Sequence, residues 1–225
     1  MRRRATVSSL LLLVAGLLLS PPIASAQSTL IKLSGYDYVT GPWQAGSTVT
    51  VVARLTPPLS GPSGFSYPFP VDFSRYEYTL AITSMVIASY AVTDWGWGML
   101  QKDATYSGGT LSIYEDAARN SSYGSNPPSA TSPSTFRDGR LVATGTLQNA
   151  SSTIFTPSGS FSAVVQFTNQ GFSPGAWNAV IALSEPPASS VPTGYAQDFT
   201  GKIEPIGSVA VAPMNWEGVK ALYRH

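Results

Sequence analysis

A strict alternation of apolar and polar side chains in short runs constrains this chain most. Such a period of two is typical of a β-strand with one buried face. The pattern recurs in residues 48–55, 161–168 and 177–183, and turn residues separate the runs. In the first run the apolar positions are Val49, Val51, Ala53 and Leu55. Short alternating runs of this kind predict an antiparallel all-β domain.

The longest alternating segment covers residues 76–95, with its apolar side chains on the even positions. The apolar side becomes ambiguous at Ser84-Met85, so we expect two strands there, or one strand bent across a corner. Gly108-Gly109 and Asp138-Gly139 are expected to be turns that precede strands. Further strands are expected in residues 31–39, 110–115, 141–147, 195–203 and 206–212.

These segments predict about nine to eleven strands in an antiparallel β-sandwich, either jelly-roll or immunoglobulin-like. A transmembrane β-barrel is the main alternative fold. It is disfavoured because the chain has no regular series of ~10-residue strands and no final strand with a terminal aromatic residue. Residues 59–70 and 117–134 are rich in Pro, Gly and polar residues, and are expected to be long surface loops.

The first 26 residues have the three parts of a cleavable signal peptide. Arg2, Arg3 and Arg4 form the basic region, residues 10–19 form a short apolar core, and Ala24-Ser25-Ala26 fits a signal peptidase. We therefore expect a signal peptide at 1–26, one β-sandwich domain at 27–213, and a tail or short helix at 214–225. The arginine-rich, alanine-terminated signal indicates a bacterial protein that is secreted or periplasmic, with cell-surface association as a further expectation.

Composition excludes several kinds of chemistry. The chain has no cysteine, which rules out disulfides, zinc–cysteine clusters, thiol catalysis and a lipid anchor at the cleavage site. Its one histidine is His225, at a chain end that is a poor place to position a catalytic imidazole. Removing 26 of 225 residues leaves 199, with 10 basic residues (13 less three) against 12 acidic ones. The net charge of about −2 and the absence of a basic stripe make nucleic acid an unexpected partner. After the predicted signal peptide the sequence has no long apolar segment, so no membrane span is expected there.

Two indoles, Trp95 and Trp97, lie two residues apart between glycines. In an extended chain both would point the same way, and flat exposed rings suit the faces of sugars. Tyr90, Trp43 and Tyr67 could extend this surface. The plainer interpretation is burial, since aromatic side chains of a sandwich usually belong to its core.

Acidic residues bracket the long polar loop: Glu115 and Asp116 before it and Asp138 after it. Calcium prefers six to eight oxygen ligands, which such a loop could supply. The plainer interpretation is that these are soluble turn residues, since no Asp-x-Asp-x-Asp spacing occurs.

Paired carboxylates that hydrolyse glycosides would have to come from Asp72, Glu77, Asp94 or Asp103, and no spacing singles out a pair. Two aromatic–acid clusters, at residues 36–38 and 195–200, could each line a pocket, although such clusters are more often packed strand edges.

The resulting functional expectation is an exported, non-catalytic protein that binds a glycan or a surface protein through exposed aromatic side chains. One alternative is a structural, self-assembling extracellular subunit. A further alternative is a carbohydrate-active enzyme that uses paired carboxylates. The sequence assigns no certain cofactor beyond the calcium hypothesis, and no oligomeric state.

Overall fold

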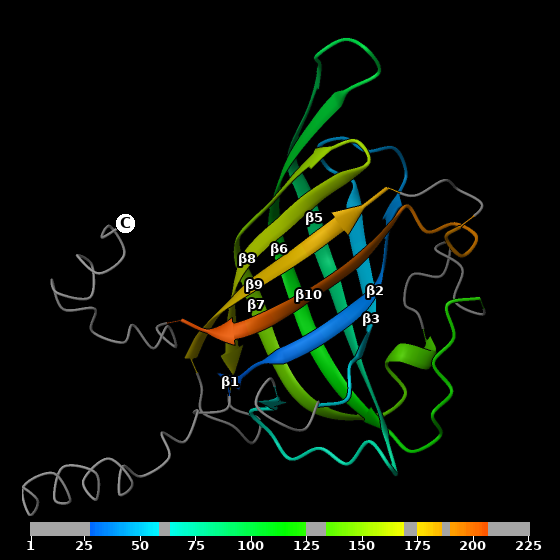
Figure 1. The fold of residues 1–225 in the computed structure, drawn as a ribbon, viewed down its shortest axis with the longest axis vertical. Helices are drawn as coiled ribbons and strands as arrows, with labels where there is room; N and C mark the ends of the chain where they lie inside the picture. Colours follow the sequence, from blue (N-terminus) through cyan, green and yellow to red (C-terminus); the bar gives the residue numbers. More distant parts are fainter. Residues whose placement is uncertain (1–27, 59–63, 125–133, 169–174, 186–189, 207–225) are drawn as a thin grey trace, which may run out of the picture.

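The computed structural model describes residues 28–58, 64–124, 134–168, 175–185 and 190–206. Eight long antiparallel strands form a closed barrel in which neighbours along the chain are also neighbours in space (Figure 1). A small parallel pair, β1 (Ser28–Thr29) and β4 (Phe65–Ser66), lies outside it. The barrel strands are β2 (Ile31–Thr40), β3 (Thr48–Leu55), β5 (Glu77–Asp94), β6 (Leu100–Asp116), β7 (Arg140–Phe155), β8 (Ser158–Thr168), β9 (Gly175–Ser184) and β10 (Gln197–Pro205).

The predicted sandwich, whether jelly-roll or immunoglobulin-like, is wrong because the first and last long strands pair with each other. β10 is in continuous antiparallel register with β2, from Gln197 opposite Asp37 to Ile203 opposite Ile31. This ladder closes the sheet on itself, whereas a sandwich keeps two separate sheets. Alternation along a strand specifies which face is buried, and a sandwich and a barrel meet that requirement equally well.

The predicted buried faces are confirmed in β3, β8 and β9, whereas in β5 the even positions expected to face the core do so only as far as Ile82. Val49, Val51, Ala53 and Leu55 point into it and are buried. Phe161 on β8 and Ile181 on β9 do the same. Apolar side chains of these strands thus face inward. Among the described residues, no helix has the length and apolar character needed to span a membrane.

The ambiguous point at Ser84-Met85 is a bulge inside one continuous strand. Ser84 has a positive φ of 59°, and the inward side changes there from Ile82 to Met85. The Gly108-Gly109 turn is a wrong prediction: both glycines lie inside β6, with φ of 67° and 103°, and Met85 pairs with Gly108. Glycine permits these backbone angles, so the two strands bend together and extend beyond the barrel.

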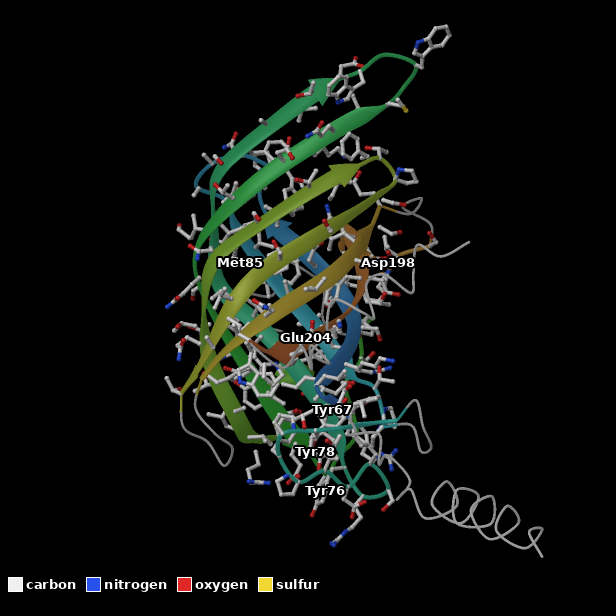
Figure 2. The ribbon with its side chains drawn as sticks, turned by 60° about the vertical axis from the view of Figure 1, so that its left-hand side comes forward. Tyr67, Tyr76, Tyr78, Met85, Asp198 and Glu204 are labelled. Carbon is white, nitrogen blue, oxygen red and sulfur yellow. The ribbon has the colours of Figure 1, made fainter. Side chains whose placement is uncertain are left out.

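The lower end of the barrel is closed by residues that were expected to form a surface loop. Of residues 59–70, the described part from 64 onward crosses this end (Figure 1) and buries Phe65, Tyr67 and Phe69 in the core. The Tyr67 hydroxyl donates to the carbonyl oxygen of Thr56 at 2.6 Å. Figure 2 shows Tyr67 and Tyr78 at this end, with Met85 higher along the barrel. Among the described residues, aromatic side chains thus close this end of the barrel.

The described parts of the second predicted loop pack against the outer wall. Tyr123 contacts Tyr36 and Phe136, with ring centroids 4.7 and 4.9 Å apart. Arg54 of β3 donates to the hydroxyl of Ser121 at 2.7 Å and lies over the Tyr123 ring. We call this group the outer cluster; its buried members are Tyr38, Val52, Phe136 and Tyr195.

The predicted signal peptide, the C-terminal tail or helix and most of the strand expected at 206–212 lie outside the described residues. The domain boundaries drawn from them therefore stay predictions. The described barrel runs from Ile31 to Pro205, inside the single domain expected at 27–213.

Candidate functional site

The upper half of the barrel contains a small apolar space, here called the inner chamber. Its volume is about 20 Å³, taken as the space that the centre of a water-sized sphere can occupy. This is enough room for about one water molecule. Inward-facing residues of seven strands line it, because successive inward positions of a barrel strand stack in layers. The apolar lining residues are Val49, Val51, Ile82, Met85, Phe161, Ile181, Leu183 and Phe199.

Asp37 brings a carboxyl group to this apolar chamber. It occupies an inward position of β2, and only 6% of the residue is exposed. Burial is the main reason that its pKa rises from 3.8 to about 8; an N–H bond from the Gln197 backbone lowers it and the charge of Glu185 raises it further. Within the described part of the chain, Oδ1 of Asp37 has no hydrogen-bond partner. Buried polar atoms are nearly always paired, so this oxygen requires an explanation.

Tyr106 is the second polar residue of the chamber. It comes from β6, and its hydroxyl is hydrogen-bonded to the hydroxyl of Ser152 on β7 at 2.8 Å. Burial raises its pKa to about 12, so the phenol stays neutral at physiological pH. Its ring packs against Phe161 at 5.8 Å between centroids. Tyr106 therefore joins the apolar chamber to a more polar layer above it.

That upper layer forms a second space, the mouth pocket, of about 70 Å³ on the same measure. Trp43 and Tyr90 form its aromatic side, with ring centroids 6.0 Å apart. Trp43 follows the end of β2, and Tyr90 follows a second bulge of β5 between Ile87 and Ser89. The other lining residues are Lys102, Ala104, Ser152, Ile154, Glu185 and Gln197.

An ion pair organises the polar side of the mouth pocket. Nζ of Lys102 donates to Oε2 of Glu185 at 2.7 Å, with both side chains mostly buried. Nε2 of Gln197 donates to the other oxygen, Oε1, at 3.3 Å. Because the Lys102 ammonium group is committed to Glu185, it is not available to balance the charge of an ionised Asp37.

The four predicted ligand-binding residues fall into two groups. Trp43 and Tyr90 lie together at the mouth pocket, whereas Trp95 and Trp97 lie at the tip of the β5–β6 hairpin, which projects beyond the barrel (Figure 1). Tyr67, which was expected to extend the same surface, lies at the opposite end (Figure 2). The aromatic surface is therefore not continuous.

At the tip, the two indoles differ in their surroundings. Trp95 is 59% exposed, and its Nε1 donates to the side-chain oxygen of Gln101 at 3.1 Å. Trp97 is fully exposed and has a positive φ of 58°. Residues Gly96 to Gly98 all have positive φ and form a turn. The two rings were expected to point the same way only if the chain were extended here, and it is not.

The three residues proposed for calcium accept hydrogen bonds from the protein. Glu115 accepts from Arg140 and from the Tyr78 hydroxyl, each at 2.7 Å. Asp116 accepts the Ala118 N–H at 2.8 Å, and Asp138 accepts from the Asn120 amide at 3.0 Å. Among the described residues, no three acidic or histidine side chains form a group that could hold a metal ion. The calcium site stays a prediction, and melting with and without a chelator tests it.

The four carboxylates considered for glycoside hydrolysis are divided between the two ends. Asp72 and Glu77 lie at or before the start of β5, whereas Asp94 and Asp103 lie on the projecting hairpin. Asp37 and Glu185 are two carboxyl groups close enough for one charge to act on the other, and no spacing signals them because they lie 148 positions apart (185 − 37).

The two aromatic–acid clusters are neighbours, because residues 36–38 lie on β2 and most of 195–200 on β10. Asp37 and Gln197 face inward, whereas Tyr38 and Tyr195 pack in the outer cluster. Both interpretations of these clusters therefore find a counterpart: Asp37 and Gln197 line internal spaces, and Tyr38 and Tyr195 pack at the strand surface.

One larger groove, of about 480 Å³ on the same measure, crosses the outer wall of β2 and β10 between Lys32 and Lys202. Lys202 is paired with Glu204 at 2.7 Å, and the groove is wide open to solvent. The interior is the stronger candidate site, since it combines enclosure with a buried polar atom that has no partner. Comparisons of the chain with protein-family models, curated proteins and solved structures found no significant match.

Proposed function

We propose that this protein is an exported binding protein that takes a small, mostly apolar molecule into the inner chamber of its barrel. One observation carries the proposal: an enclosed apolar chamber faces a buried carboxyl oxygen that has no partner. Eight-stranded barrels have interiors that side chains just fill or that hold one small ligand. The mouth pocket, at the end opposite the aromatic closure, supplies the route of entry.

The size of the chamber limits the ligand. Space for about one water molecule means that a larger guest has to displace side chains. Met85 is suited to this, because its unbranched thioether changes rotamer easily. Trp43 and Tyr90 are only partly buried at the mouth, where they pack against the core. A ring of about five carbons is therefore a suitable first probe.

The test uses methylenecyclopentane and protein labelled with ¹³C at the methionine methyl groups. Met85 lines the chamber, and Met99 at the hairpin tip, 57% exposed, serves as an internal control. We expect a saturable shift of the Met85 methyl signal and none of the Met99 signal. A Met85→Leu variant assigns the signal. If Met85 does not respond, or if both signals drift together, the chamber takes no ligand and the proposal is wrong.

A second candidate function is the binding of glycans or surface proteins by the aromatic side chains at the tip of the β5–β6 hairpin. It is supported by the complete exposure of Trp97, since a large aromatic side chain in a strained turn contributes little to the fold. A glycan array comparing the wild type with a Trp95→Ala/Trp97→Ala variant tests it. Phe155→Ala, at an exposed site on the neighbouring strand β7, is the matched control. Unchanged binding by the double variant would remove the aromatic tip as the binding site.

A further inference from the structure

Among the described residues of the inner chamber, none forms a hydrogen bond with Oδ1 of Asp37. Its carboxyl group accepts one N–H from the Gln197 backbone, while Oδ1 faces a wall of aliphatic and aromatic side chains. An ionised carboxylate there would lose its hydration without gaining a cation in return. A carboxylic acid in the same place carries one O–H that needs an acceptor.

The groups that surround Asp37 favour the acid form. β3, β8 and β9 present apolar side chains to the chamber, such as Val51, Phe161 and Ile181. β6 presents Tyr106, a neutral phenol already bonded to Ser152, and β5 presents Tyr90 above it.

Glu185, after β9, adds negative charge, and the one ammonium group of the mouth pocket, on Lys102, is bound to it at 2.7 Å. β10 contributes Gln197, whose side-chain amide also bonds to Glu185. No lysine or arginine lines the inner chamber in the part of the chain that the structure describes.

This inference rests on the binding in the inner chamber (lumenal binding) proposed above. We propose that the natural ligand carries a carbonyl or similar acceptor oxygen, to which Asp37 donates a hydrogen bond as a carboxylic acid. The ligand class is thus a small apolar ketone, aldehyde, ester or ether. A charged amine is the competing chemistry. It would require Asp37 to lose its proton, and the neutral walls of the chamber would have to accept a cation.

This assignment gives binding a pH dependence of definite sign. With a pKa of about 8, Asp37 holds its proton at pH 6 and has lost it at pH 10. The preference for an acceptor oxygen is therefore present at the lower pH and disappears as the pH rises through about 8. An amine bound to the carboxylate would show the opposite trend near pH 8, because ionisation of Asp37 would favour it.

The experiment compares cyclopentanone with methylenecyclopentane, which have the same shape and differ in C=O against C=CH₂. The dissociation constants are measured from the Met85 methyl shift, in the wild type and in Asp37→Leu. Taking the ratio of the two constants cancels the different hydration of the two probes, as in a double-mutant cycle. We expect Asp37→Leu to weaken cyclopentanone relative to methylenecyclopentane by roughly tenfold, the usual value of one buried hydrogen bond.

Asp37→Asn is the matched control, since its amide is an N–H donor of similar shape that does not titrate. It should keep much of the preference for the ketone at both pH 6 and pH 10, whereas the wild type should lose the preference at the higher pH. Asp37→Leu replaces the buried carboxyl group by an apolar side chain with as many non-hydrogen atoms but a larger volume, which affects two probes of the same shape alike. Its folding is checked by circular dichroism and by urea unfolding.

The outcomes separate the inference from the function on which it rests. If methylenecyclopentane binds and the ratio is the same in the wild type and Asp37→Leu, the acceptor hypothesis is overturned and lumenal binding stands. A preference that grows with pH would also overturn it. If neither probe shifts Met85, lumenal binding itself fails, and a single water molecule is the remaining occupant of the chamber.

Discussion

Replacing Asp37 by asparagine should change the pH dependence of folding by a large and calculable amount. In the unfolded chain the carboxyl group titrates near 3.8, and in the barrel near 8. Below about pH 3.8 both states are protonated, so the group has no effect on the free energy of unfolding. Between the two values the unfolded state is ionised while the folded state keeps its proton, and stability falls as the pH rises. Above about pH 8 both states are ionised and the loss is complete.

The size of the effect follows from the two pKa values. At about 1.4 kcal/mol per pH unit, the interval from 3.8 to about 8 corresponds to a total loss of about 6 kcal/mol. About 4 kcal/mol of this is already lost at pH 7. No large discount for solvent screening applies, because Asp37 is only 6% exposed. Asparagine cannot ionise, so any cost of the buried amide is constant across the range.

The assay is urea unfolding followed by tryptophan fluorescence, for both proteins, from about pH 4 to pH 9 at constant ionic strength. The difference in unfolding free energy between wild type and Asp37→Asn removes the contributions of all other titrating groups. Over this pH range we expect the difference to move by about 5 kcal/mol in favour of the variant. A change of less than about 1 kcal/mol would mean that Asp37 is solvated or paired in solution, and the reasoning about the chamber would be wrong.

Three further predictions, which use four substitutions, test the fold. Phe136→Ala should cost about 3–5 kcal/mol in urea unfolding, because Phe136 is completely buried in the outer cluster; a loss below about 1 kcal/mol would contradict that packing. Gly109→Ala should cost about 1–3 kcal/mol, because its φ of 103° is unsuited to a side chain, whereas Gly124→Ala, in open surroundings, should be nearly neutral. Trp97→Ala should leave the melting temperature within about 1 °C of the wild type, since the indole is fully exposed; a larger fall would assign Trp97 a structural role.

The candidate site shows where inference from the sequence stops. Asp37 belongs to a cluster that the sequence singled out, and Trp43 and Tyr90 were already expected to bind a ligand. Lys102 and Glu185 could not be found, because they are unremarkable residues 83 positions apart that meet only when the barrel closes. Trp95 and Trp97 were grouped with Trp43 by composition, and the projecting hairpin separates them.

The sequence by itself determined the β class, the inward face of most strands and the exclusion of cysteine chemistry. A period of two is a local property that each strand carries in its own residues. Tertiary structure alone decided that the sheet closes, that Phe65, Tyr67 and Phe69 seal one end, and that Asp37 is enclosed at the other. These features depend on the pairing of β2 with β10 across the length of the domain. Alternation fixes the face that a strand buries and leaves its partner open, because every strand offers the same backbone donors and acceptors to its neighbours.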